Sequence, residues 1–311
     1  MTGRPIAASL AAVLLWALYL VGTRIVFAAT RIDPFAYALC QMLVGGLFMV
    51  ALAGRGRVAW LQLLNGWTAI YGLLRTSVIG TTSLALVYLP AGQSSLLGSI
   101  NVPMAAVAEA WLRRKRPPAI EFLGNGLLLL AAVLVITALP DVRAYIGLLW
   151  QLVSEASAVL SGVIVWRHPA NQGDSIRERA RTTGVLLITA GLVMMAGWWL
   201  LAEGGLASQP FSDQRGSFGD PMLWLYGSAA GVLVRGPGTY ISLYVYRYGG
   251  IHLHMAGLAA IPAATIALEQ LAIALGWLRP VHLGVVELAA VGLVLAAAII
   301  LLRAKTRNAA T

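Results

Sequence analysis

The stretch LVYLPAGQSSLLGSINVPMAAVAEAW, residues 86–111, decides the fold because a weaker copy of it follows 159 residues later. At that offset residues 72–108 contain eight identical pairs, which are Gly72 and Gly231, Leu74 and Leu233, Ser83 and Ser242, Leu84 and Leu243, Gly98 and Gly257, Pro103 and Pro262, Ala105 and Ala264, and Ala108 and Ala267. In both copies an apolar segment stops at a short turn, and a second apolar segment with an internal proline begins. This pattern predicts a duplicated pair of membrane helices.

The composition of the whole chain agrees with a membrane protein. Of the 311 residues, 59% are apolar and only 11% are charged, and the mean hydropathy of +0.80 is too high for a soluble domain. The single cysteine, Cys40, excludes a disulfide within the chain and makes a thiolate metal site implausible. The sequence therefore predicts an all-α integral membrane protein in the lipid bilayer, with no metal and no cofactor.

Ten apolar runs have about the 20 residues that a helix needs to cross a bilayer. They fall at residues 6–28, 34–53, 67–88, 91–112, 119–139, 145–166, 183–202, 222–246, 250–276 and 283–302. Two copies of five helices must cross the membrane in opposite senses, which predicts inverted repeats at 1–143 and 144–311 around a central cavity. The hydrophilic segment 203–220 is expected to be a flexible loop, and the chain to work as a monomer or homodimer.

The positions of lysine and arginine predict the orientation in the membrane. With the N-terminus inside, the inside segments carry fifteen basic residues and the outside segments five. This bias predicts that both termini, including the basic C-terminal tail, and the basic loop 113–116 are cytoplasmic, as in a multi-pass protein of the plasma (inner) membrane. The net charge of +10 is explained by these loops, so nucleic-acid binding is not expected.

Three stretches resemble the EamA-type repeats of the drug/metabolite transporter superfamily. They are LLWALYLVGTR at 14–24, ALVYLPAGQSSLL at 85–97 leading to Pro103, and SLYVYRYGG at 242–250 leading to Pro262. The resemblance covers nearly the whole chain. It implies an inner-membrane secondary transporter that exports a small metabolite or amino acid through a central cavity.

Charged side chains inside membrane spans are costly, at about 3 kcal/mol each, and usually face a cavity or a partner. Six residues meet this description, namely Arg75, Glu109, Glu155, Arg235, Glu269 and Glu287. Arg75 and Arg235 are 160 residues apart, close to the repeat offset, so both are expected near the membrane midplane. We predict that they bind an anionic or zwitterionic substrate, although Arg235 could instead be paired with a glutamate at a packing kink.

The remaining candidates are aromatic, acidic or helix-distorting. Aromatic side chains that could stack on the substrate are Trp16, Tyr19, Tyr71, Tyr240 and Tyr244. Glu155 is the preferred proton or cation site, while Glu109 and Glu269 could couple transport or simply neutralise an arginine. Pro237 between Gly236 and Gly238 should kink or break its helix, and Pro103 and Pro262 should act as hinges that free the carbonyls of Ser99 and Leu258.

Two other classes of function compete with a carrier. An intramembrane enzyme needs a nucleophile and a base at membrane depth, but no histidine lies well inside a span to activate Ser161 or Ser228. A channel-like permease should show a filter loop or a ring of pore-lining residues, and neither is visible in the sequence. The sequence therefore favours a carrier over an enzyme or a channel.

Overall fold

The computed structural model describes residues 3–56, 66–114, 118–167, 175–203, 217–248, 250–281 and 284–308. Within these ranges the chain forms helices and turns and no strand, which confirms the predicted all-α fold. In the same ranges eight helices are long and apolar enough to cross a membrane, and a shorter apolar helix covers Val285–Leu301. The chain is therefore a multi-pass membrane protein.

The helices lie close to the apolar runs of the sequence. Those of the first half are α1 (Gly3–Ala29), α2 (Pro34–Ala53), α4 (Gly66–Tyr88), α5 (Ala91–Gly98), α6 (Asn101–Arg113) and α7 (Ala119–Thr137). Those of the second half are α8 (Val142–Arg167), α9 (Ile176–Glu203), the 3₁₀ turn η2 (Ser217–Gly219), α10 (Pro221–Ala230), the π-helical η3 (Gly231–Arg235), α11 (Gly236–Tyr248), α12 (Gly250–Ala274) and α13 (Val285–Asn308). Most of the predicted loop 203–220, part of the basic loop 113–116 and the last three residues of the tail lie outside the described residues.

The run 91–112, expected as one helix bent at Pro103, is divided into α5 and α6. The backbone tightens at the junction, where the N–H groups of Ser99 and Val102 donate to carbonyls three residues earlier, Leu96 at 3.2 Å and Ser99 at 3.2 Å. Pro103 has no N–H to donate to the carbonyl of Ser99, four residues before it, so the N–H of Val102 donates to that carbonyl instead. The prediction that the Ser99 carbonyl is left free is therefore wrong, and Pro103 lies in the first turn of α6.

The second proline of the repeat behaves differently. Pro262 lies inside α12, which continues from Gly250 to Ala274 without a break. The flanking turns keep the helix intact although the proline removes one backbone hydrogen bond. The two repeat prolines thus occupy different helical settings.

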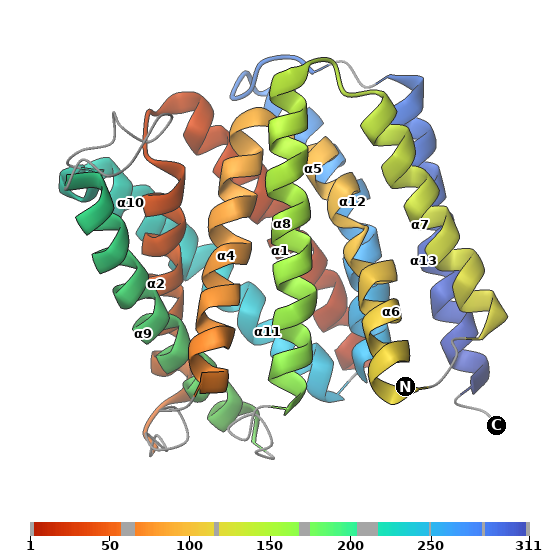
Figure 1. The fold of residues 1–311 in the computed structure, drawn as a ribbon, viewed down its shortest axis with the longest axis horizontal. Helices are drawn as coiled ribbons and strands as arrows, with labels where there is room; N and C mark the ends of the chain where they lie inside the picture. Colours follow the sequence, from red (N-terminus) through yellow and green to blue (C-terminus); the bar gives the residue numbers. More distant parts are fainter. Residues whose placement is uncertain are drawn as a thin grey trace.

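The helices pack in pairs that join the two halves of the chain. α2 packs on α9, α4 on α8, α7 on α13, and α1 on both α11 and α12 (Figure 1). α2 and α9 meet at Gly46 and Gly184, where a Cβ on either residue would lie 2.8 Å from the carbonyl oxygen of the other. Only glycine permits this approach of the two backbones. Figure 1 also shows that α1 begins and α13 ends at the same end of the bundle.

Candidate functional site

Arg235 ends the π-helical segment η3, where the helix that begins as α10 widens before it continues as α11. The N–H of Gly236 donates to the carbonyl of Gly231, five residues back, and Pro237 follows without an N–H. The predicted kink or break at residues 235–238 thus takes the form of a π-helical turn in a chain that stays helical. Such turns are frequent at functional sites.

Glycines make room for this segment against α2. A Cβ on Gly45 would lie 3.3 Å from the Cγ of Arg235, and a Cβ on Gly236 would lie 2.6 Å from the Cδ1 of Phe48. Gly238 has ordinary space, since its Cβ would lie 3.6 Å or more from α1. Gly45 and Gly236 therefore let the backbone that carries Arg235 approach α2 closely.

The guanidinium of Arg235 is stacked on two aromatic rings of α1. Its Cζ lies 4.9 Å from the ring centroid of Trp16 and 5.4 Å from that of Tyr19, and the two rings meet edge to face at 5.9 Å. The indole N–H of Trp16 donates to the Oγ of Ser242 at 3.2 Å, which fixes the ring from the opposite helix. Three residues predicted for the substrate site therefore lie together.

Arg235 is almost completely buried, with 2% of its surface exposed, and no carboxylate compensates its charge among the described residues. Its electrostatic neighbours are Tyr19, Tyr71 and Arg75, and its Nε and Nη2 have no hydrogen-bond partner within the ranges that the structure describes. These two nitrogens form one edge of the guanidinium, the edge that binds a carboxylate bidentately. The alternative of a glutamate partner for Arg235 is not found in the part of the chain that the structure describes.

Arg75 on α4 lies within electrostatic range of Arg235. The Nε of Arg75 is also buried without a hydrogen-bond partner. Tyr71, one turn earlier on α4, packs with Ile164 and Leu186. Two guanidinium groups and three aromatic side chains thus surround one region of the bundle.

The structure places the last two predicted aromatic residues elsewhere on α11. Tyr240 packs against a cluster that includes Met42, Ile79 and Leu187, contributed by α2, α4 and α9. The ring of Tyr244 lies 4.7 Å from that of Tyr248, near the end of the helix. Neither stacks on Arg235, so their assignment to the substrate site rests on the sequence alone.

Glu269 on α12 caps the start of α5. Its carboxylate oxygens accept the backbone N–H groups of Ala91 at 2.8 Å and Gly92 at 2.7 Å. Arg24 on α1, which interacts electrostatically with Glu269, donates to the carbonyls at the end of α4, Leu86 at 2.6 Å and Val87 at 3.1 Å. The opposite charges therefore satisfy both helix ends at the α4–α5 junction.

Sequence reasoning missed the role of Arg24. A signal was present, because Leu89 and Pro90 between two apolar runs leave the first N–H groups of a buried helix without acceptors. The acidic Glu269 and the basic Arg24, which lie on other helices, were the available partners.

Glu155 on α8 faces the junction of α5 and α6. Its Oε2 accepts the amide of Asn101 at 2.8 Å, and its Oε1 accepts the amide of Gln151 at 2.6 Å. The Oε1 of Gln151 in turn accepts the hydroxyl of Ser94 at 2.7 Å. Glu109 lies about two turns beyond Asn101 on α6.

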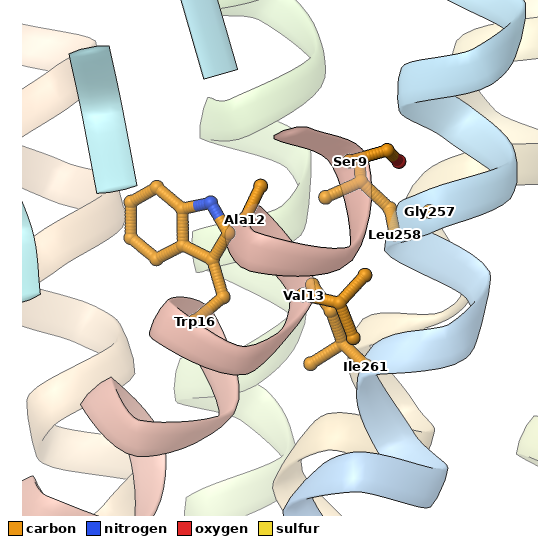
Figure 2. A pocket seen from close by; sticks show the side chains of 7 residues that line it. All are labelled: Ser9, Ala12, Val13, Trp16, Gly257, Leu258 and Ile261. Carbon is orange, nitrogen blue, oxygen red and sulfur yellow. The ribbon is translucent and has the colours of Figure 1, made fainter. Parts of the chain in front are cut away.

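A narrow pocket opens beside the aromatic pair, between α1 and α12. It is lined by Ser9, Ala12, Val13, Trp16, Gly257, Leu258 and Ile261. Figure 2 shows Ser9 and Val13 directed at α12, while the indole of Trp16 points away from it. Trp16 therefore belongs both to the lining of this pocket and to the aromatic pair at Arg235.

Comparison with known proteins agrees with this architecture. Residues 4–137 match the model of the EamA-like transporter family. A solved structure described as "Crystal structure of protein" has a TM-score of 0.63 to this chain over 96% of both chains at 16% identity, which establishes the likeness of the fold alone. No curated protein matches significantly. Residues 4–137 therefore resemble the EamA-like transporter family, which belongs to the drug/metabolite transporter superfamily.

Proposed function

We propose that this protein is a secondary transporter that exports a small metabolite or amino acid across the inner membrane by alternating access. The buried guanidinium of Arg235, whose charge no carboxylate among the described residues compensates, carries the proposal. A permanently charged group in a membrane interior is costly unless a partner neutralises it. A substrate carboxylate bound to Nε and Nη2 would neutralise Arg235 and would leave again on release.

The environment of Arg235 also favours an organic substrate over a bare anion. Trp16 and Tyr19 lie against the guanidinium, 4.9 and 5.4 Å from its Cζ to their ring centroids, and restrict how it can turn. Arg75 adds a second positive charge nearby. Rigid aromatic walls beside a fixed cationic fork are suited to a ligand with one carboxylate and an uncharged or zwitterionic body.

We further propose that the chain crosses the membrane ten times in two inverted repeats, 1–143 and 144–311, with both termini cytoplasmic. The packing pairs support this layout because they follow a two-fold exchange of the halves. α2 pairs with α9, α7 with α13 and α5 with α12, while the α4–α8 pair is matched by α1–α11.

An untargeted comparison of metabolites tests the transporter proposal. Cells that overexpress the protein should release at least one carboxylate-bearing metabolite faster than cells with an empty vector. That metabolite is then studied by counterflow in proteoliposomes. A carrier exchanges substrate across the bilayer, whereas an enzyme would convert it and a channel would conduct without exchange.

A further inference from the structure

Glu155 occupies a space that the end of α5 leaves open for it. A Cβ on Gly98, the last residue of α5, would lie 3.2 Å from the Oε1 of Glu155 and 3.4 Å from the Nε2 of Gln151. The carboxyl group is thus placed against the junction of residues 99 and 100, where α5 gives way to α6. A change in the protonation of this carboxyl group therefore takes place beside the point where the segment 91–112 divides into α5 and α6.

The hydrogen bonds of Glu155 link three helices. Ser94 on α5 donates to Gln151, Gln151 donates to Glu155, and Asn101 on α6 donates to the other carboxyl oxygen. In this series of hydrogen bonds every donor points toward the carboxyl group, which is the arrangement expected of an ionised carboxylate.

No cation lies against Glu155 among the described residues. The elements packed on α8 are α4, α5 and α6. α5 has no titratable residue, and the others contribute Tyr71, Arg75, Tyr88, Glu109 and Arg113. Arg75 is within electrostatic range of Arg235. Among the described residues, the groups that stabilise Glu155 are therefore neutral amides, which offset part of the cost of a charge inside a membrane span.

The same side chains can also hold a neutral carboxylic acid. If the amide of Gln151 turns over, its oxygen accepts the new O–H of Glu155, and its NH₂ donates to the Oγ of Ser94. The Ser94 hydroxyl is then free to donate to a carbonyl of its own helix, as the neighbouring Ser95 does with Gly92 at 2.8 Å. Binding of one proton thus reverses the hydrogen bonds between α8 and α5 without leaving a polar group unpaired.

We infer that Glu155 is a reversible proton-binding site, in which the loss or gain of one proton reverses the Ser94–Gln151–Glu155 hydrogen bonds at the α5–α6 junction. The inference rests on the proposed transporter function for its purpose, since it gives the carrier a coupling proton. The site itself is defined by contacts and can be tested without a transported substrate.

Infrared difference spectroscopy of the purified, reconstituted protein during a pH titration measures the site directly. We expect a carbonyl band of a protonated carboxyl group that grows as the pH falls. The band should be lost in Glu155→Gln and kept in Glu287→Gln. Glu287 is a matched control because its carboxylate also accepts a side-chain amide, from Gln93 at 3.2 Å. The only ligand that is varied in this titration is the proton.

A second pair of variants leaves Glu155 in place and covers the case in which Glu155→Gln does not fold. Ser94→Ala removes the acceptor that the reversed Gln151 needs, so the band should shift in frequency. Ser95→Ala should leave the band unchanged, because Ser95 bonds only within its own helix. An unshifted band in Ser94→Ala would contradict the reversal.

A titrating band of equal size in Glu155→Gln would overturn the inference. So would a wild-type spectrum without any titrating carboxyl band across the pH range in which the protein stays folded, since Glu155 would then be fixed in one state. Failure of these tests leaves the transporter proposal standing. A protein that passes them but exchanges no metabolite would refute the transporter proposal alone.

Discussion

At the scale of single residues, Arg235 is buried where no carboxylate among the described residues compensates its charge. Burial of Arg235 is tolerated because Trp16 and Tyr19 lie at the guanidinium and Gly45 leaves space for its aliphatic stem. The π-helical turn ends at Arg235, and Pro237 two residues later has no N–H for a regular α-helical bond. The site therefore depends on small residues as much as on the charged one.

Gly45→Ala tests this dependence. The new methyl group would lie 3.3 Å from the Cγ of Arg235, so the side chain must shift by a few tenths of an ångström. We expect substrate affinity to fall several-fold, equivalent to about 1 kcal/mol, with a smaller change in thermal stability. Gly162→Ala, where no atom lies within 4 Å of the new methyl group, is the control. Equal affinities in the two variants would show that the position of Arg235 is not critical.

At the scale of helices, the α4–α5 junction depends on the charges of Arg24 and Glu269. In Glu269→Gln the side chain keeps one acceptor oxygen and turns an NH₂ group toward a backbone N–H of α5, which loses its partner. We expect the variant to be less stable by about 1–3 kcal/mol, measured by thermal unfolding in detergent. Glu178→Gln on the exposed face of α9 should unfold at the wild-type temperature. Unchanged stability in Glu269→Gln would mean that water caps the helix equally well.

The α2–α9 contact is the second prediction at this scale. A methyl group on Gly46 would meet the backbone carbonyl of Gly184 at 2.8 Å, and a backbone cannot swing away as a side chain can. Gly46→Ala should therefore force the helices apart and cost about 1–3 kcal/mol. Gly197→Ala, which meets nothing within 4 Å, serves as the matched change on α9. If both variants unfold at the same temperature, the close approach of the helices contributes nothing to stability.

The sequence predicted helix positions better than helix irregularities. The run 34–53 matches α2, because apolar length and the Asp33–Pro34 start signal are local properties. The division at residues 99–100 and the π turn at 231–235 were not predicted, since they depend on which carbonyl a proline deprives and on what packs beside it. Trp16 and Tyr19 were predicted with Arg235, but their stacking requires helix rotations that only the packed structure provides.

At the scale of the whole molecule, the proposed orientation makes a direct prediction. In a Cys40→Ser background, Pro140→Cys between α7 and α8 should react with an impermeant thiol reagent added outside intact cells. Arg55→Cys, just after α2, should react only after the membrane is opened. Both positions are exposed, so access to the reagent is decided by the membrane. The reverse labelling pattern would invert the orientation that the basic residues predict.

We propose that Arg235 holds the substrate, and counterflow of the metabolite identified by the efflux comparison measures this role. Lysine keeps the charge but loses the two-pronged donor edge, so Arg235→Lys should fold while its exchange rate per folded protein falls about tenfold or more. Arg75→Lys should weaken exchange less, and Arg177→Lys on the exposed part of α9 should leave it unchanged. Near wild-type exchange by Arg235→Lys would contradict the account and would show that the substrate is recognised elsewhere.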